Sequence, residues 1–587
     1  MKNRTLVFEW ASTLIVAAII FCFFYFYAWG GMYCYSNEEL FLLSTDFASQ
    51  YLTYPSGFLQ YAAKLFAQFL IVRSLGALVF AFLFVSLQRL VWSVASAFRK
   101  NHVYYLLSFL ILDLFFFDNI VIRSKPLMSI ACVINMALFL LIVKVKVARA
   151  RFLIESLALF LTYWLTGGAF FVLMILLIVY EVRRYVIQKM YYEAFFCSVS
   201  ILLIGLLYPC LAAYFSAWMF SEVLMFTNIV DGSSTIFYLF FVPALSLIIA
   251  YFPVLNFFRR IPIYVAQVVL VLLYLKMGMS SISQESEYMD RDVYYAFNSE
   301  WSKIVENSKL HKPVYMARSV ISNMALQKCN KMADEFYVNA PTNYNMIYFP
   351  HNIEQRLNYN VCASAGIVAY ELGLINLALE HFTEYNSSQI TDNLNVLFLK
   401  YQIKIFIARG NYKVAEKLLK ILKKTIFHKK WANEMSAYLY NDKKVMQNEE
   451  LAKFRKMKYP DNLVYSMVET DVVLYTVFKA NPWNRALYEY LLFEILRHRD
   501  LKDFAIVYDM GSKYNEYPKG IPLNFQQALS LYWVMAGKNI DEIPYYIEPQ
   551  VLQDCLRIYY ASTHNENVLA FVKKKYPGTF WAYYFNN

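Results

Sequence analysis

Long apolar runs in the first 280 residues constrain this chain more than any other feature of its sequence. A helix that crosses a lipid bilayer needs about 20 predominantly apolar residues in succession. Runs of that kind lie at 9–30, 65–91, 103–122, 126–143, 195–218, 235–258 and 262–280. The rest of the chain, 281–587, has the mixed polar and apolar pattern of a soluble helical protein. The sequence therefore predicts an all-α protein with a polytopic membrane module at 1–280, followed by a soluble helical part.

Basic residues between the apolar runs indicate how the module is oriented. They cluster at Lys2 and Arg4, at Arg99 and Lys100, at 144–151 (KVKVARAR), at 183–189 (RRYVIQK), and at Arg259 and Arg260. Lysine and arginine are enriched on the cytoplasmic side, so an even number of crossings must separate neighbouring clusters. The run 152–182 has such a cluster on each flank, and we therefore expect two short helices folded at Thr166-Gly167-Gly168. This arrangement has about nine crossings.

The same rule places the N-terminus in the cytoplasm and the soluble part outside it. The first loop, 31–63, is then external, as are the loop 118–125, the tip of the folded-back segment and the loop 219–234. In a Gram-negative cell this face of the inner membrane is periplasmic. We therefore expect a bacterial inner-membrane protein with a periplasmic C-terminal domain.

Composition and motifs exclude several classes of function. The net charge of +12 does not indicate nucleic-acid binding, because the basic residues lie at helix ends or mix with acids along helical patterns. The chain has no GxxxxGK[ST] phosphate loop, no GxGxxG after a strand, no GxSxG and no HExxH. The external loops of the membrane module contain no histidine, and no CxxC pair occurs, so we predict no metal site and no obligate cofactor.

Helical periodicity dominates the soluble half, which we divide into a helical linker region at 281–350 and a repeat domain at 351–587. In CASAGIVAYELGLINLALEHFTEY, small residues and an aromatic stand where a tetratricopeptide repeat needs them: Gly366, Gly373, Ala378 and Phe382. The pattern returns at Gly410 and Ala415, and a third copy centres on Ala505. We interpret this domain as a tetratricopeptide-like array, with an irregular helical domain as the alternative. The concave face of such an array suits a protein or peptide partner.

Acidic residues gather in the loops that we expect to be external. They are Glu38, Glu39 and Asp46 in the first loop and Asp118 in the second. A carboxylate there suits general-base chemistry, because it can take the proton of a hydroxyl group that attacks the anomeric carbon of a sugar. The alternatives are structural: solvated loop residues at the first site, and a helix cap paired with Arg123 at the second.

Basic residues accompany these acids. Arg123 and Lys125 follow Asp118, and Arg73 is expected about two helical turns inside the second span. A charge at that depth costs roughly 3 kcal/mol unless it is paired or solvated, which makes Arg73 a functional candidate. The alternative for Arg73 is a side chain that extends to the membrane interface. Because arginine and lysine can hold a departing phosphate, carboxylates beside cations indicate a phosphate-bearing lipid substrate.

The segment EELFLLSTDFASQYLTYPSGFLQYAAKLFAQF (38–69) resembles the first external loop of the GT-C superfamily of membrane glycosyltransferases. The likeness is to a bacterial group similar to protein O-mannosyltransferases, in which an acid precedes a His-Pro-Pro-Gly turn and an amphipathic helix. The turn here is Tyr54-Pro55-Ser56-Gly57, and its spacing matches Glu39 to the catalytic acid, with Asp46 as the rival. DNIVIRSKPLMSI (118–130) resembles the second loop of the family, where basic residues meet the lipid phosphate.

The resemblance implies a donor sugar carried on a polyprenyl phosphate and an acceptor on the outer face of the membrane, with a protein hydroxyl favoured. The implied catalytic residues are Glu39, Asp46, Glu38 and Asp118. The resemblance implies phosphate contacts at Arg123 and Lys125, and we add Arg73, from its predicted depth, and Tyr54 of the turn as candidate substrate contacts. The chain departs from the family in lacking a DxD motif and an Asp-Glu dyad, and in having tyrosine for the histidine of the turn.

Two other classes of function stay open. The whole chain also resembles a family of Bacteroidetes membrane proteins whose activity is not established. One alternative is a membrane-anchored helical-repeat scaffold for envelope assembly. The other is a transporter or lipid flippase, which needs ionisable residues near the bilayer midplane and broken helices in matched halves. The sequence shows no matched halves, and a glycosyltransferase is therefore our leading interpretation.

Overall fold

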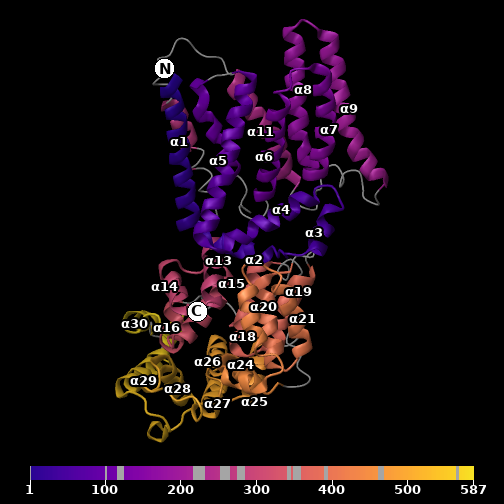
Figure 1. Cartoon of the computed structure of the whole chain (residues 1–587). Coiled ribbons are helices and arrows are strands. Elements are labelled where there is room, and N and C mark those ends of the chain that lie inside the picture. Colours follow the sequence, from indigo (N-terminus) through magenta and orange to yellow (C-terminus); the bar gives the residue numbers. More distant parts are fainter. Residues whose placement is uncertain are drawn as a thin grey trace. The chain divides into compact units, whose positions relative to one another are not determined.

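The computed structural model describes residues 2–99, 102–115, 125–215, 232–251, 265–273, 276, 284–339, 346–347, 358–388, 394–459, 469–563 and 568–586. Every regular element in these ranges is a helix (Figure 1), and the all-α prediction is confirmed for them. The chain divides into two compact units, close to the boundary expected at residue 280. The first comprises Met1–Gln284 with Lys424–Phe427, and the second comprises Glu285–Lys423 with His428–Asn587.

The first unit combines long apolar helices with a group of short ones. The long ones are α1 (Lys2–Cys22), α5 (Arg73–Phe98), the 3-10 helix η3 (His102–Phe115), α6 (Lys125–Ile142), α7 (Ala148–Thr166), α8 (Phe170–Ile187), α9 (Tyr191–Phe215) and α11 (Gly232–Tyr251). The short ones are the π-helix η1 (Phe23–Tyr27), α2 (Trp29–Glu38), α3 (Thr45–Leu52), α4 (Gly57–Gln68), η2 (Phe69–Ile71) and η4 (Gly167–Ala169). In Figure 1, α2, α3 and α4 lie at one end of the long helices.

Four helical segments in the described residues are long and apolar enough to cross a membrane: Leu6–Tyr27, Arg73–Phe98, Ala148–Ile187 and Tyr191–Tyr214. Shorter apolar helices occur at His102–Leu112, Leu127–Ile142 and Phe240–Tyr251. These elements support a membrane protein, whereas the arrangement with nine crossings stays a prediction.

The run 152–182 folds back on itself, as its basic flanks predict. Gly167 has a φ of 56° at the end of α7, a conformation that glycine adopts readily, and η4 leads directly into α8. At the far end, Arg151 at the start of α7 donates to Glu181 near the end of α8, with Nε–Oε1 at 2.6 Å and Nη2–Oε2 at 3.2 Å. The two helices are therefore antiparallel, and we call them the α7–α8 hairpin.

Helix α5 begins at Arg73, which corrects the second predicted span. The predicted helix ran from 65 to 91 and placed Arg73 two turns inside it. Val72 has an extended backbone (φ −97°, ψ 112°) between η2 and α5, so α4 and α5 are separate helices. Glu9, near the start of α1, lies 3.9 Å from Arg89 of α5 (Oε2–Nη1). Since Arg89 is near the end of its helix, α1 and α5 are antiparallel.

The second unit is a succession of shorter helices. They are α13 (Gln284–Phe297), α14 (Trp301–Leu310), α15 (Met316–Lys328), α16 (Met332–Asn339), α18 (Tyr359–Leu372), α19 (Ile375–Ser388), α20 (Val396–Ala408), α21 (Tyr412–Leu422), α22 (Lys429–Ser436), α23 (Asp442–Gln447), α24 (Glu449–Lys456), α25 (Thr470–Ala480), α26 (Arg485–Arg497), α27 (Leu501–Ser512), α28 (Leu523–Met535), η6 (Ile540–Glu542), α29 (Pro549–Thr563), α30 (Val568–Lys575) and α31 (Phe580–Tyr584). The expected linker region, 281–350, supplies α13 to α16, and α15 packs against α18.

Consecutive helices of this unit pack in pairs at the glycines that the sequence singles out. Gly373 (φ 89°) joins α18 to α19, and Gly410 (φ 80°) joins α20 to α21. A Cβ on Gly366 would lie 2.3 Å from the Phe382 ring, so the absent side chain lets α18 and α19 approach closely. Around Ala505, α26 and α27 form another contacting pair. The helix pairs are present, and their tetratricopeptide interpretation stays a prediction.

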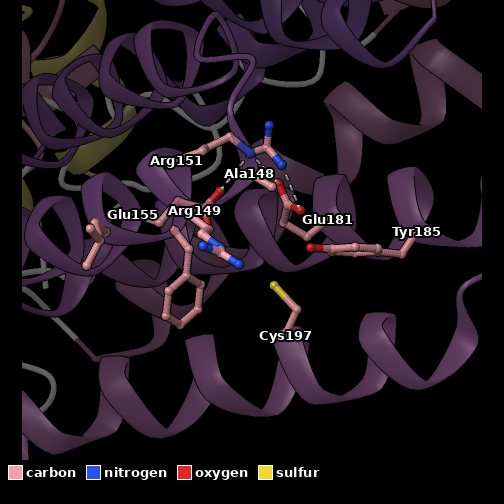
Figure 2. Close-up of a pocket in the computed structure, with 9 residues that line it drawn as sticks. Ala148, Arg149, Arg151, Glu155, Glu181, Tyr185 and Cys197 are labelled. Atoms are coloured by element: carbon pink, nitrogen blue, oxygen red, sulfur yellow. Dashed lines mark hydrogen bonds and ion pairs between the residues drawn. The ribbon is translucent and has the colours of Figure 1, made fainter.

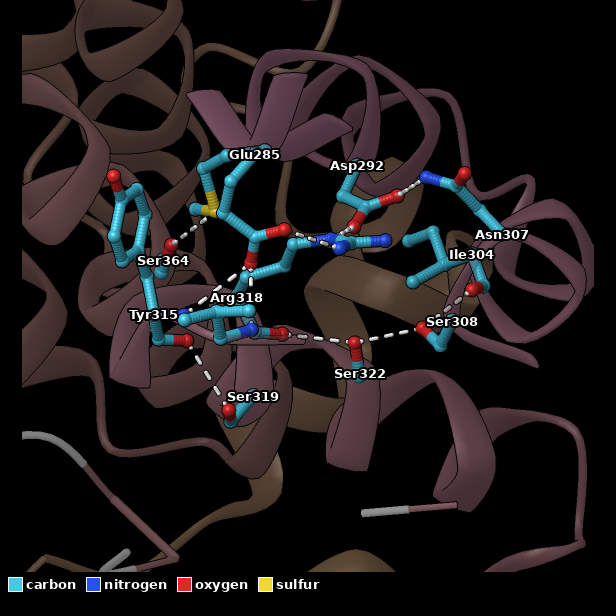
Figure 3. A network of polar contacts seen from close by, with 12 residues as sticks. Glu285, Asp292, Ile304, Asn307, Ser308, Tyr315, Arg318, Ser319, Ser322 and Ser364 are labelled. Atoms are coloured by element: carbon cyan, nitrogen blue, oxygen red, sulfur yellow. Dashed lines mark hydrogen bonds and ion pairs between the residues drawn. The ribbon is translucent and has the colours of Figure 1, made fainter. Parts of the chain in front are cut away.

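A buried arginine connects α13, α14 and α15 (Figure 3). Arg318 of α15 donates from Nε to Asp292 at 2.9 Å and from Nη1 to Glu285 at 2.8 Å, both on α13. Asn307 of α14 donates to the other Asp292 oxygen at 2.8 Å. The N–H of Val314 donates to the other Glu285 oxygen at 2.7 Å. Each of the four carboxylate oxygens in this Arg318 cluster therefore accepts a hydrogen bond.

Candidate functional site

The first loop folds as two short amphipathic helices joined by a turn. Ser44 begins α3, where its Oγ accepts a hydrogen bond from the Phe47 N–H at 3.3 Å. After α3, Ser56 has a φ of 67° and Gly57 begins α4. A Cβ on Gly57 would lie 1.6 Å from the carbonyl oxygen of Tyr51. Only glycine fits there, so the YPSG sequence is what allows the chain to reverse from α3 into α4.

This turn packs against the tip of the α7–α8 hairpin. The Ser56 N–H donates to the carbonyl oxygen of Trp164, near the end of α7, at 2.8 Å. Helix α4 also contacts α6 and α7 along its length. The pattern of basic residues predicts that the first loop and the hairpin tip share one face of the module, and the structure brings these two segments into contact.

Glu39, the residue after α2, forms an ion pair with Lys64 of α4. The Lys64 Nζ lies 2.8 Å from the Glu39 Oε2, and the side chains are 7% and 19% exposed, respectively. One turn along α4, Gln68 donates from Nε2 to the main-chain oxygen of Glu39 at 2.5 Å. These contacts hold the end of α2 against α4. The lysine stabilises the negative charge of the carboxylate and limits the positions it can adopt.

The other predicted residues of the first loop have different surroundings. Glu38 is the half-buried last residue of α2, and Asp46 is exposed in the first turn of α3, where the helix dipole favours an acid. Tyr54 is half-buried in the turn and donates from its hydroxyl to Gln60 Oε1 at 3.0 Å. Burial raises the pKa of Tyr54 to about 12, so it stays a hydrogen-bond donor at neutral pH. Among the three acids, the structure gives the lysine partner to Glu39.

Arg73 contacts the end of α1 rather than the interior of a span. Its Nε donates to the main-chain oxygen of Tyr25 in η1. Its guanidinium carbon lies 4.5 Å from the ring centroid of Tyr25 and 5.0 Å from that of Trp29. The depth argument for Arg73 is therefore wrong, because the residue opens α5 and its side chain is exposed. Its phosphate-binding role stays a prediction.

The second external loop falls largely outside the described residues. This applies to Asp118 and Arg123, whereas Lys125 is the first residue of α6. The roles predicted for these three residues stay predictions.

A cavity of about 430 Å³ lies at the other end of the α7–α8 hairpin (Figure 2). Its charged and polar lining comprises Arg149, Arg151 and Glu155 of α7, Glu181 and Tyr185 of α8, and Cys197 of α9. In Figure 2 the Tyr185 hydroxyl and the Cys197 thiol point toward the space below the Arg151–Glu181 pair. We call it the hairpin cavity.

Two carboxyl groups of the hairpin cavity share one buried arginine. Arg151 donates twice to Glu181 and once, from Nη1, to the carbonyl oxygen of Val145 at 3.0 Å. Glu155 Oε1 lies 3.6 Å from the Arg151 Nε, and this oxygen accepts no hydrogen bond from the described residues. Arg184 lies 3.7 Å from Glu181 on its other side. Glu181 thus has two cationic partners, Arg151 and Arg184, whereas buried Glu155 has only the longer contact with Arg151 among the described residues.

Lys64, Glu155 and Glu181 are missing from the predicted site. The two glutamates stand near the two ends of the apolar run 152–182, and an ionisable residue in a segment of this kind is a functional candidate by default. The criterion that selects Arg73, an ionisable residue in an apolar run, also selects Glu155 and Glu181. A single lysine in an amphipathic helix resembles a solvated residue, so Lys64 carries no comparable signal. Among the described residues, no group of three histidine, cysteine or acidic side chains is arranged to hold a metal ion.

The model of one protein family matches residues 4–587, and its description is "Family of unknown function (DUF6057)". The chain belongs to this family. A search of curated proteins found no match, and a search of solved structures also found none. Membership in DUF6057 therefore brings no activity with it, and the functional argument rests on the chemistry of the site.

Proposed function

We propose that this DUF6057 protein is a GT-C-type membrane glycosyltransferase, which transfers a sugar or glycan from a polyprenyl-phosphate-type donor to a hydroxyl group, in particular one on a protein. The observation that carries the proposal is the largely buried ion pair of Glu39 and Lys64. It places a carboxylate at the end of the long apolar helices, beside amphipathic helices suited to a membrane surface. A fixed carboxylate in such a place is suited to act as a general base.

In the proposed reaction, Glu39 takes the proton of the acceptor hydroxyl while the hydroxyl oxygen attacks the anomeric carbon of the donor sugar. The bond from that carbon to the phosphate oxygen breaks, and its electron pair leaves with the phosphate. Asp46 is the alternative base. The other proposed participants are Glu38 and Asp118 as further acids, and Arg123, Lys125, Arg73 and Tyr54 as contacts of the phosphate and the sugar. Cations there would stabilise the charge that develops on the leaving group.

The proposed location is the inner membrane of a bacterium, with the N-terminus in the cytoplasm and the second unit in the periplasm. The helix pairs of that unit would then bind and present the acceptor protein. Cysteine labelling tests this orientation. In intact spheroplasts, and in a background in which the eight native cysteines are replaced, Asp46→Cys is expected to react with a membrane-impermeant maleimide, and Lys146→Cys is expected to react only after lysis. The reverse pattern would exclude an external reaction at Glu39.

The activity is tested in a deletion strain complemented with variants, by mass spectrometry of its glycosylated envelope proteins and polysaccharides. Glu39→Gln is expected to abolish the transfer, whereas the exposed Asp46→Asn is expected to retain it if Glu39 is the base. The exchange Glu39→Lys with Lys64→Glu restores an ion pair but removes the carboxylate at residue 39. Activity of this double variant would mean that the pair is purely structural.

The same experiment separates the alternative classes. A scaffold for envelope assembly would tolerate Glu39→Gln and Asp46→Asn alone and together, since neither change removes a helix. Unchanged glycans in the deletion strain itself would exclude the enzyme. A transporter would leave the glycans of the deletion strain intact while changing the lipid or solute content of the two membrane faces.

A further inference from the structure

The hairpin cavity contains a buried carboxyl group, that of Glu155, with one oxygen that accepts no hydrogen bond from the described residues. The Glu155 side chain is 1% exposed, and its Oε1 accepts no hydrogen bond from the described part of the chain. The nearest cation, Arg151, uses its Nε, Nη1 and Nη2 on Glu181 and on the backbone. An unpaired charge on a carboxyl group buried in this way is unfavourable, so a cationic partner that arrives would stabilise the carboxylate form. A primary ammonium group would supply a positive charge beside Glu155 and N–H donors for its Oε1.

A second cation, Arg149, lines the same cavity. Arg149 lines it and is an exposed residue of α7, and it forms no ion pair with the described residues. Figure 2 shows its guanidinium in the space between Glu155 and Cys197, with the Tyr185 hydroxyl on the far side. Arginine with a hydroxyl donor is a common arrangement for binding phosphate oxygens. The cavity therefore has an anion-binding side and a cation-binding side.

Exposed apolar side chains are present on the helices that line the hairpin cavity, and one of them, Leu153, lines the cavity itself. Leu153 and Leu157 of α7 are 65% and 68% exposed, and Phe196 of α9 is 66% exposed. The cavity also lies where candidate membrane spans begin and end, since the spans start at Ala148 and Tyr191 and one ends at Ile187. Lipid head groups lie at this depth, and acyl chains would run along the exposed leucines.

We propose that the hairpin cavity binds a membrane phospholipid whose head group carries a phosphate ester and a primary ammonium. The ammonium contacts Glu155 and the phosphate contacts Arg149 and Tyr185. Free phosphoethanolamine has the same two groups, but the apolar rim favours the lipid. The cavity is at the opposite end of the hairpin from the proposed glycosyl-transfer site, so this lipid is distinct from the proposed donor.

Native mass spectrometry of the delipidated full chain tests the proposal, with phosphatidylethanolamine, phosphatidylcholine and phosphatidylglycerol as probes. All three lipids have the phosphate. Phosphatidylethanolamine adds a primary ammonium, phosphatidylcholine adds a quaternary ammonium, and phosphatidylglycerol has no cationic group. The wild type is expected to bind phosphatidylethanolamine about tenfold more tightly than the other two, because their head groups cannot donate hydrogen bonds from nitrogen. Equal binding of phosphatidylethanolamine and phosphatidylcholine by the wild type overturns the proposal without any variant.

Variants test separately which residues bind the ammonium and which bind the phosphate. Glu155→Gln is expected to remove the preference for phosphatidylethanolamine over phosphatidylcholine, and Arg149→Ala is expected to weaken all three lipids. Glu193→Gln, an exposed acid in the first turn of α9, is the matched control and is expected to change neither. Soluble phosphoethanolamine is expected to compete weakly. If it binds as tightly as the lipid, the ligand is a free phosphate ester and the proposal of a membrane lipid is wrong.

Discussion

Arg318 in the second unit and Arg151 in the first each lie between two carboxyl groups, and the two clusters differ in how far their acids are satisfied. In the Arg318 cluster, Asn307 and two backbone N–H groups complete the hydrogen bonds that the arginine begins. In the hairpin cavity, no such group donates to the Oε1 of Glu155 among the described residues. Carboxylates whose oxygens all accept hydrogen bonds are suited to holding helices together, whereas a carboxyl group with an unpartnered oxygen beside a cavity is suited to binding.

The largest effect is expected when the Arg318 cluster loses its cation. Arg318→Met leaves Glu285 and Asp292 facing each other in a buried site, and breaking a buried ion pair typically costs about 3–5 kcal/mol. Hydrogen exchange of the full chain in detergent is expected to show lost protection in α13 and α15. Exchange in α7 and α8 is expected to stay as in the wild type. Normal protection of α13 would mean that this cluster does not stabilise the unit.

Removing one charge from the same cluster is expected to have a smaller effect. In Asp292→Asn, one of the two oxygens that accept from Arg318 and Asn307 becomes an amide nitrogen facing a donor. The expected loss is about 2 kcal/mol of unfolding free energy, measured by chemical denaturation with hydrogen exchange of α15. Glu306→Gln on the exposed face of α14 is the control and is expected to be neutral. An equal loss of unfolding free energy in Asp292→Asn and Glu306→Gln would mean that the hydrogen bonds of Asp292 do not stabilise the second unit.

His428, a buried base of the second unit, predicts how the stability of this unit depends on pH. Burial lowers the pKa of His428 to about 3, and the Lys400 ammonium adds to this shift. Because the unfolded chain takes up the proton near pH 6.5, the stability that depends on neutral His428 is complete above pH 6.5. It falls as the pH drops toward 3, by about 2 kcal/mol at pH 5.

His428→Gln is therefore expected to flatten the acid limb of the stability profile. His498→Gln is the matched control, because the His498 side chain is 56% exposed. Chemical denaturation of the full chain between pH 5 and pH 8 measures both. Parallel profiles for wild type and His428→Gln would show that another group governs the acid sensitivity.

The smallest effect on stability is expected at the hairpin cavity. Glu155→Gln keeps the shape of a buried side chain whose Oε1 accepts no hydrogen bond from the described residues, so the unfolding free energy is expected to change by less than about 1 kcal/mol. Thermal unfolding in detergent without added phospholipid measures it. A loss as large as that of Asp292→Asn would make the two clusters equivalent and would assign Glu155 a purely structural role.

Several features of the fold were accessible to sequence reasoning because they follow from short-range chemistry. The hairpin follows from Gly167 and its basic flanks, and the helix pairs follow from Gly373 and Gly410. The break before Arg73 was not accessible, because it falls at Val72 in an apolar stretch without glycine or proline, where hydropathy is continuous. The packing of Lys64 on Glu39 depends on how α2 and α4 meet, which no local pattern encodes.

In the candidate site, too, local sequence patterns predict some features, whereas others depend on how distant helices pack. The spacing to the YPSG turn predicts Glu39 as the catalytic acid, and the structure adds the Lys64 partner that distinguishes Glu39 from Asp46. Glu155 and Glu181 were detectable as acids in apolar runs, but their shared arginine became visible only once the helices were paired. Sequence thus identifies unusual residues, and three-dimensional pairing decides which of them are satisfied.

The antiparallel hairpin has a consequence for biosynthesis. Helices α7 and α8 have 19 and 18 residues, and only the three-residue element η4 separates them. If α7 left the translocon alone, the Arg151 guanidinium would reach the membrane without its Glu181 partner. When both helices leave together, the guanidinium and the carboxylate neutralise each other at the moment of insertion. We therefore expect the ribosome to complete Glu181 before α7 is released into the bilayer.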